Sequence, residues 1–335
     1  MGGTSAHDGE MRFRHAAMLL SLLIVLAGCR TGATSAPWQS AVGREHRLVG
    51  RIWDVAARRF LDEATTVTRI VEARYVLLGE KHDNPDHHAM QARMIRALTA
   101  AGRRPAVAFE MFTPSQNAAL GRYLAAHPRD AAGIGGAVNW KASGWPTWAM
   151  YEPVAQAALD ADLLIVVANL DTERVRAVGR EGLAALDPGF ARRHGLDQPL
   201  AAHVRLAMAK DISDSHCGHA PADRIDAMIV AQRARDARMA EALLTAPGND
   251  GAVLIAGGGH VRNDFGVPVY VRRTDPAARI VSVALVEVDA KHTDVESYAR
   301  RFGGRPPFDY VWFTPAVDDE DPCEKFRKSL ERLRR

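Results

Sequence analysis

The chain has 335 residues, of which 47% are hydrophobic and 25% are charged, an ordinary composition for a soluble globular protein. Its length allows one large α/β domain, with or without an inserted helical segment. The formal net charge of +3 is small and the arginines are interspersed with acidic residues, so nothing indicates a nucleic-acid partner. The three cysteines show no zinc-ribbon spacing, which argues against a structural zinc site.

The N-terminal segment predicts export and a lipid anchor. A basic stretch (11–15) precedes an apolar run (16–27) that is too short to span a bilayer as a resident helix. The run closes on Leu26-Ala27-Gly28-Cys29, which resembles a bacterial lipobox with Cys29 as the lipidated residue; a plain secretory signal is the alternative. Arg30 follows, instead of the Asp associated with inner-membrane retention, so we expect an outer-membrane anchor facing the periplasm of a Gram-negative bacterium.

These features divide the sequence into four parts. We predict a signal peptide over 1–28, a tether over 29–48, a folded domain over 49–323 and a C-terminal tail over 324–335. If Cys29 is lipidated, Cys217 and Cys323 remain as a pair in an oxidising compartment. We therefore predict a disulfide between them.

The predicted elements alternate between strand and helix along the domain. Strands are predicted at 50–54, 75–80, 106–110, 163–169, 252–256, 267–272 and 280–288, and helical segments at 60–73, 90–102, 115–125 and 147–159 and within 172–244. This alternation predicts an α/β fold, with a mostly parallel sheet flanked by helices. We expect a small helical cap from segments near 113–161 and 172–220.

Four of the strand-like runs finish on a polar side chain that is capable of chemistry. These side chains are Glu80, Glu110, Asn169 and His260. Apolar runs without polar alternation suit strands buried on both faces of a parallel sheet, and the carboxyl ends of such strands open onto one crevice. We therefore expect the four side chains at one rim, together with His82. Ordinary turn chemistry at strand ends is the alternative.

The segment after Glu80 is dense in groups that bind metals or exchange protons. We expect Glu80 and His82 at the rim, where they can hold a divalent ion or act as a general acid and base. His87 and His88 fall at a predicted helix start, and we expect both to face solvent.

A glycine-rich turn (257–259) follows another of these runs. Backbone amides in such a turn can approach an anion closely, and Arg262 can pair with that anion. The turn lacks the Lys-Ser/Thr of a P-loop and the GxGxxG spacing of a dinucleotide fold, so nucleotide binding has little support.

Aromatic side chains gather between Trp145 and Tyr151. Trp148 and Tyr151 are three residues apart and therefore share one helix face. Aromatic walls can cover a haem macrocycle, and an anionic tyrosinate oxygen suits ferric iron. The alternative is that these rings pack between the cap and the core.

Short motifs in a specific order extend over about residues 50–323. They are Leu78-Gly79-Glu80-Lys81-His82-Asp83-Asn84-Pro85, Phe109-Glu110-Met111, Trp145 with Tyr151, Ala168-Asn169-Leu170, Ser215-His216-Cys217, Ala231-Gln232 with Arg235-Asp236 and Met239-Ala240, and the segments 258–268, 309–315 and 321–323. Together they resemble the ChaN family of haem-binding lipoproteins, within the wider Tiki/TraB and erythromycin-esterase-like superfamily.

This resemblance implies an α/β domain with a small helical domain that binds haem across a homodimer and serves haem and iron uptake. It implies that Tyr151 ligates the iron and that His216 of the facing subunit assists. Because Trp148 shares a helix face with Tyr151, we expect it to contact the cofactor as well. His219 lies close enough in sequence to take the same role. An outer-membrane haem receptor is a further partner that this role implies.

The same resemblance keeps a second function open. In the enzymatic relatives the rim is catalytic or metal-binding, and here it corresponds to Glu80, His82, Glu110 and His260. The alternative function is therefore a metal-dependent periplasmic hydrolase. Whether the chain is an enzyme is left open by the sequence.

Overall fold

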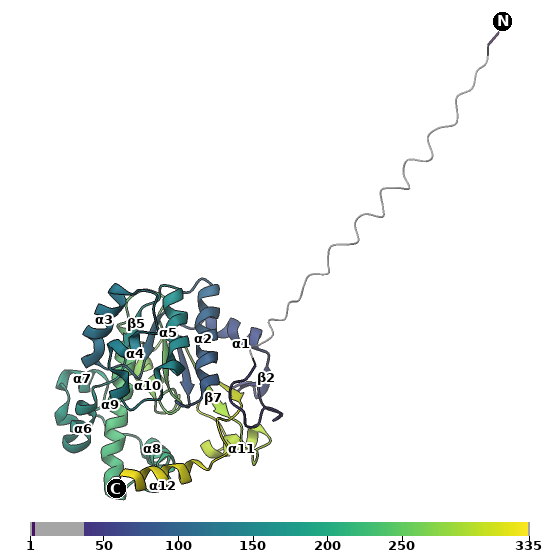
Figure 1. Cartoon of the computed structure of the whole chain (residues 1–335). Coiled ribbons are helices and arrows are strands. Elements are labelled where there is room, and N and C mark those ends of the chain that lie inside the picture. Colours follow the sequence, from purple (N-terminus) through teal and green to yellow (C-terminus); the bar gives the residue numbers. More distant parts are fainter. Residues whose placement is uncertain (1, 4–36, 334–335) are drawn as a thin grey trace. The chain divides into compact units, whose positions relative to one another are not determined.

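Eight strands of the described residues, 2–3 and 37–333, form one sheet in this computed structural model (Figure 1). The order is β2-β1-β8-β7-β3-β6-β4-β5; the pairs from β8 to β5 are parallel, whereas β1 runs antiparallel to both neighbours. The strands are β1 (Ile52–Asp54), β2 (Arg59–Leu61), β3 (Tyr75–Glu80), β4 (Ala106–Phe109), β5 (Ile165–Val167), β6 (Ala252–Gly257), β7 (Ile280–Glu287) and β8 (Tyr310–Thr314). The predicted α/β class with a mostly parallel sheet is confirmed.

The central strands are buried on both faces, which explains their unbroken apolar sequences. In β3, Val76 and Leu78 join the hydrophobic core on one face of the sheet, whereas Tyr75 and Leu77 join the core on the other face. Successive side chains of a strand point to opposite faces, so a continuous apolar run supplies both cores at once.

Helices complete both cores (Figure 1). The first core takes buried residues from α1 (Glu63–Val71), α2 (Pro85–Ala100), α3 (Asn117–Ala126), α4 (Ile134–Ala137) and α5 (Trp148–Asp160). The second takes them from α6 (Thr172–Glu181), α7 (Pro188–Arg193), α9 (Ile225–Leu244), α10 (Val267–Thr274) and α11 (Val295–Ala299). The helices α8 (Ala202–Ser215) and α12 (Pro322–Leu333) lie outside these two cores.

The described residues from Trp38 onward form one compact unit, and the helices of 113–161, predicted as part of a small cap, lie within it. They pack directly on the first face of the sheet, and α5 lies against α2. Within the second predicted segment, only α8 among the described helices stands apart from both cores.

Two predictions of local structure are wrong. Residues 267–272, predicted as a strand, form α10, because Gly266 is its extended N-cap and Pro268 occupies its first turn, where the missing N–H is not needed. The predicted helix 60–73 begins with β2, and helix α1 starts only at Glu63, with the Asp62 carboxylate accepting from Thr65 N–H. Strand β8 was not predicted at all.

Residues 38–48 belong to the domain, not to the predicted tether. The backbone N–H groups of Gln39 and Ser40 donate to the Asp86 carboxylate at 2.7 and 2.8 Å, and Leu48 is fully buried. Residues 4–36, which include Cys29, nearly all of the signal peptide and most of the tether, lie outside the described residues, so these features stay predictions. Within the described part, no helix is long and apolar enough to cross a membrane.

Candidate functional site

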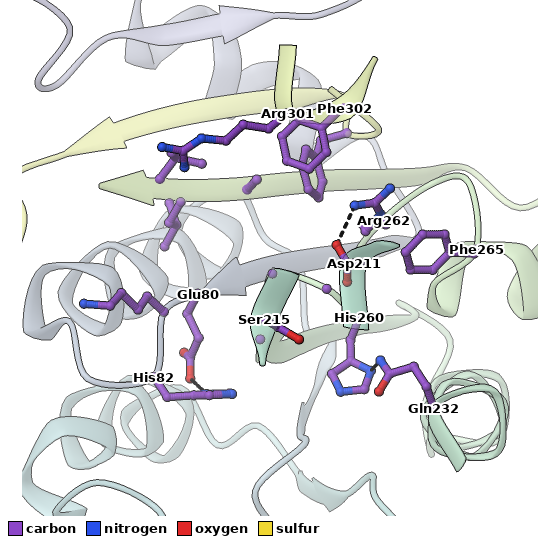
Figure 2. A pocket seen from close by; sticks show the side chains of 18 of the residues that line it. Glu80, His82, Asp211, Ser215, Gln232, His260, Arg262, Phe265, Arg301 and Phe302 are labelled. Atoms are coloured by element: carbon purple, nitrogen blue, oxygen red, sulfur yellow. Dashed lines mark hydrogen bonds and ion pairs between the residues drawn. The ribbon is translucent and has the colours of Figure 1, made fainter. Parts of the chain in front are cut away.

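A cavity of about 960 Å³ opens where β3, β4 and β6 reach their carboxyl ends (Figure 2). The helices α8 and α9 form one side of it, and β7, β8 and the segment from Val295 to Phe308 form the other. The volume lies near the upper end of small-molecule sites. Polar groups gather at the strand ends, and the remaining wall is largely apolar, with Met208, Ile212, Met228, Phe265, Phe302 and Phe308.

Glu80 ends β3 and is a buried carboxylate with four donors around it. Its Oε1 accepts from His82 Nδ1 at 2.9 Å and from the Tyr151 hydroxyl at 3.1 Å. Its Oε2 accepts from Gln91 Nε2 at 2.7 Å and lies 3.2 Å from His88 Nδ1. Burial by itself would raise the pKa of Glu80, but His88 and His82 outweigh it and hold that pKa far below its usual value. Glu80 is therefore ionised and fixed in orientation.

His82 stands beside Glu80 at the cavity floor. Because its Nδ1 is directed at the Glu80 carboxylate, its Nε2 is the ring nitrogen left for the cavity. Burial lowers the pKa of His82, but the hydrogen bond to Glu80 and the charge of Glu110 outweigh it, so the net shift is upward. Trp145 covers the ring, with 4.7 Å between ring centroids.

His260 lies between two buried carboxylates. Its Nδ1 donates to Asp236 Oδ1 at 2.5 Å, and its Nε2 is 3.3 Å from Glu110 Oε1. Burial would lower the pKa of His260, but Glu110 and Asp236 raise it to about 9. The pKa of Glu110 is held well below its usual value, since the charges of His260 and Arg235 outweigh its burial. His260 is accordingly a cation at neutral pH.

Arg235 of α9 links the ends of β4 and β5. It donates from Nη2 to Glu110 Oε1 at 2.5 Å and from Nε to Asn169 Oδ1 at 3.2 Å. Asn169 therefore reaches the site through this guanidinium. Three of the four strand-end side chains expected at one rim, Glu80, Glu110 and His260, line one cavity together with His82, whereas Asn169 does not line it.

Gly257 lies against both His82 and Glu110 and lines the cavity with them. A Cβ on Gly257 would lie 2.9 Å from His82 Nε2 and 3.6 Å from Glu110 Oε2. The Gly257 N–H donates to the same Oε2 at 2.7 Å. A side chain at 257 would therefore crowd His82, and glycine there leaves His82 and Glu110 open to the cavity.

The glycine turn and Arg262 do not form the anion site that the sequence suggested. The amides of Gly257 and Gly258 donate to Glu110 Oε2 and to the Glu80 carbonyl oxygen. Arg262 is buried and already neutralised, with Asp211 at 2.9 Å and Asp264 at 2.8 Å. Its guanidinium also lies over the Phe265 ring, 4.1 Å from the centroid. These contacts of Arg262 instead connect α8 to the loop that follows β6.

The expected solvent exposure of His87 and His88 is wrong. Both rings are buried. His87 Nδ1 accepts from the Lys81 N–H at 2.9 Å, and its Nε2 lies 2.9 Å from the Thr314 hydroxyl. His88 Nε2 donates to the His82 carbonyl oxygen at 3.1 Å. Both therefore brace the loop that carries His82.

Tyr151 and Trp148, predicted to bind the cofactor, lie in the first core and do not line the cavity. Tyr151 is fully buried, donates to Glu80 and packs against His88 and Trp140. Burial and the charge of Glu80 raise its pKa, which opposes formation of a tyrosinate. Trp148 donates to the Ala131 carbonyl oxygen at 2.8 Å. The aromatic rings of α5 therefore pack in the core, which was the alternative interpretation of this segment.

His216, which the resemblance assigned to the cofactor of the facing subunit, lines the cavity of its own chain from the end of α8. Its Nδ1 lies 2.8 Å from the Ile212 carbonyl oxygen. A carbonyl oxygen only accepts, so Nδ1 carries the proton and Nε2 of the neutral ring retains its lone pair. His219 does not line the cavity and stacks on Phe326 instead.

Cys217 and Cys323 form the disulfide that was predicted, with 5.3 Å between their Cα atoms. It joins the turn after α8 to the first turn of α12. The predicted tail 324–335 therefore begins inside a helix that is covalently tied to the domain.

Several lining residues carried no signal in the sequence. Tyr298 of α11 lines the cavity and accepts the Asp289 N–H at 2.6 Å, and Arg301 lies one turn further along. Asp211, the partner of Arg262, was not singled out either. Each comes from a segment without a motif, so only the fold reveals it. Among the described residues, no group of three or more His, Cys, Asp or Glu side chains is placed to hold a metal ion.

An α/β sheet with a large cavity at the carboxyl ends of its strands defines a ligand-binding α/β protein. The model of the family described as haem-binding uptake, Tiki superfamily, ChaN, matches residues 66–271, which is more than half of the chain. The chain therefore belongs to this family, and haem is the family's cofactor. The resemblance inferred from the motifs is confirmed.

Three solved structures are similar to the chain, and the first of them shares its fold. The structure of cofacial haem binding to ChaN of Campylobacter jejuni is 22% identical, with a TM-score of 0.60 over 78% of this chain and 95% of that chain. An erythromycin esterase EreC mutant in its open conformation is 14% identical, with a TM-score of 0.43 over 78% of this chain and 95% of that one. The type III effector HopBA1 is 13% identical, with a TM-score of 0.41 over 75% and 92%. No curated protein matches the chain.

Proposed function

We propose that the chain binds haem in the cavity under α8, in the role of a haem-uptake protein. The observation that carries this proposal is the cavity itself, which has about 960 Å³ and a wall of aromatic and aliphatic side chains. Such a wall suits a flat, apolar macrocycle. Family membership and the likeness to a haem-binding ChaN support the same ligand.

The residues present fit a haem. His216 offers an Nε2 lone pair, oriented by the bond from its Nδ1 to the Ile212 carbonyl oxygen, which is how protein-bound metals receive imidazole. Arg301 lines the cavity with a half-exposed side chain and can receive a propionate, since its distance to Asp289 is 3.6 Å. When bound, the haem supplies an iron whose reactivity is set by its axial ligand.

Ligation by Tyr151 has no support in this geometry. Within the described residues, Tyr298 is the tyrosine that lines the cavity. Its hydroxyl accepts a backbone N–H, and Arg301 lies near its ring, at 5.5 Å from the centroid. We therefore carry two ligand candidates forward, His216 first and Tyr298 second.

A haemin titration of the soluble chain 31–335, followed by absorbance, tests the proposal. We expect saturable binding by the wild type, loss or a spectral change of the ferric complex in His216→Ala, and an unchanged complex in Tyr151→Phe. Tyr298→Phe tests the second candidate. An absence of saturable binding, or binding that depends on Tyr151, would contradict the assignment.

A second candidate function is hydrolysis at the rim, and the meeting of His82, Glu110 and His260 in the lining of one cavity favours it. A water molecule held in the cavity could reach His82 Nε2. The ionised Glu80 would hold His82 as a general base, and the cationic His260 would stabilise developing negative charge. Chromogenic esters provide the assay: wild-type hydrolysis should disappear in Gly257→Ala, whose added methyl group would crowd His82 Nε2, and in His82→Ala. Equal rates in all three proteins would argue against the rim.

We also propose that the protein is an outer-membrane lipoprotein facing the periplasm, anchored through Cys29, that it works as a homodimer, and that it exchanges haem with an outer-membrane receptor. The lipobox-like sequence supports the anchor, and the Cys217–Cys323 disulfide suits an oxidising compartment. Labelled palmitate should enter the wild type and not Cys29→Ser. Sedimentation of the soluble chain with and without haemin tests the dimer.

A further inference from the structure

The turn that carries His216 has a backbone conformation that its residues do not favour by themselves. After α8, the Cys217 N–H donates to the Asp214 carbonyl oxygen at 3.0 Å and the Gly218 N–H to the Ser213 carbonyl oxygen at 2.8 Å. This is a Schellman C-cap, whose left-handed position is usually glycine. Here that position is Cys217, with a φ of 53°. A side chain at this position costs free energy that another contact must offset.

The disulfide is that contact. It joins Cys217 to Cys323, 106 residues later, at the start of α12. One turn further on, Phe326 lies between two imidazoles of the same turn, with centroid distances of 5.9 Å to His216 and 6.0 Å to His219. Helix α12 therefore holds the turn through one covalent bond and one ring.

The other attachments of α8 to the domain come before the turn that carries His216. Among its described side chains Met208 is the buried one, and it packs in a small hydrophobic cluster with residues of α9 and the loop after β6. Ion pairs join Arg205 to Asp226 and Asp211 to Arg262. Because the turn follows all of these contacts, the position of His216 depends on the attachment of the turn to α12.

We propose that the Cys217–Cys323 disulfide is a redox-sensitive clasp that positions His216 over the cavity and that a dithiol reductant can open. Cys323 is exposed, so its sulfur can be reached by an attacking thiolate. The reaction breaks the S–S bond and forms two thiols; the dithiol supplies two electrons and two protons and becomes a disulfide. The opened turn can leave the left-handed conformation at Cys217, and the last turn of α8 loosens together with His216. The consequence for haem rests on the proposed function, whereas the clasp does not.

Hydrogen–deuterium exchange of the ligand-free chain 31–335 tests the clasp without haem. In Cys323→Ser, peptides covering 209–219 should exchange at least tenfold faster than in the wild type, and the same should follow reduction and alkylation of the wild type. Lys210→Ala is the matched control, since it removes an exposed pair with Asp214 on the same helix and should leave the exchange unchanged. Wild-type exchange rates in Cys323→Ser would overturn the clasp.

Two variants at position 217 separate the effect of the left-handed backbone conformation from the effect of the disulfide. Cys217→Ser and Cys217→Gly both lack the disulfide, but glycine adopts the left-handed conformation without strain. We expect slower exchange of 209–219 in Cys217→Gly than in Cys217→Ser. Equal exchange would overturn the contribution of the left-handed cysteine.

Haemin titrations of the wild type, Cys323→Ser, His216→Ala and the double variant then test the link to the ligand. Cys323→Ser should weaken binding at least tenfold, and the same change should have no further effect once His216 is alanine. Unchanged haemin affinity in Cys323→Ser would overturn the positioning role. If the wild type binds no haemin while the exchange still differs, the proposed function fails and the clasp stands.

Discussion

Helices α5 and α8 both carry side chains that the sequence singled out for haem, yet the two helices are built in opposite ways. Helix α5 buries seven of its residues in the first core, including Tyr151 and Trp148, whereas α8 buries only Met208 among its described side chains. A polar group in a packed core is satisfied by fixed partners, and Tyr151 is bound to Glu80. A side chain on a helix that buries few residues, such as α8, can face the cavity instead. Local sequence chemistry therefore identifies a suitable ligand, but the packing of its helix decides whether a ligand can reach it.

The largest effect on stability is expected for Glu80→Ala, which removes the carboxylate that Tyr151 of α5 contacts. The substitution leaves the buried donors of His88, Gln91 and Tyr151 without their carboxylate. We expect a loss of about 3 to 5 kcal/mol in the free energy of unfolding, measured by urea denaturation.

Glu63→Ala is the matched control for that measurement, because it removes a carboxylate from an exposed pair with Arg93. It should cost at most about 1 kcal/mol. A similar cost for both variants would show that the Glu80 network is not a rigid part of the floor.

The next effect is a pH dependence that arises from His260. Its pKa is raised to about 9 in the folded chain by Glu110 and Asp236, against about 6.5 when unfolded. The bound proton therefore stabilises the fold fully below pH 6.5, and this stabilisation is lost as the pH rises through 9. The difference is roughly 3 to 4 kcal/mol by linkage.

Urea denaturation of the wild type and His260→Gln at pH 6 and pH 9.5 measures this contribution. The variant should lose less stability between the two pH values. His82 and His88, whose pKa values are also raised, keep part of the dependence in both proteins. The same pH dependence in wild type and variant would rule out a cationic His260.

Tyr151→Phe is expected to have an intermediate effect on stability. It tests the comparison between α5 and α8 most directly. It removes a buried hydroxyl that donates to an ionised carboxylate, so we expect a loss of about 1 to 3 kcal/mol in the free energy of unfolding. Haemin binding should stay at the wild-type level. A stable variant that no longer binds haemin would reverse the roles assigned to α5 and α8.

The smallest effect is expected for Asp211→Asn on the covering helix. The Asp211 carboxylate is 40% exposed, and Arg262 keeps its pair with Asp264, so global stability should fall by no more than about 1 kcal/mol. Local exchange in α8 should nevertheless increase, because one of its attachments is weakened. A large global loss would mean that α8 belongs to the core after all.

Much of the fold followed from apolar runs. The strands β3, β4, β6 and β7 were found within two residues of their ends, because strands buried on both faces contain little besides Val, Ile, Leu and Ala. Strand β8 was missed and 267–272 was assigned the wrong type, since Tyr, Val and Phe suit either state when tertiary contacts decide.

The sequence by itself determined the α/β class, the family and the rim, because strand-end residues of a parallel sheet must meet at one edge whatever the helices do. It also identified the cysteine pair. Tertiary structure alone decided that Tyr151 is a core residue, that Tyr298 and Arg301 line the cavity, and that α12 holds the turn of His216. These facts depend on which face of a helix meets the sheet and on contacts between segments up to 106 residues apart, which short-range patterns do not encode.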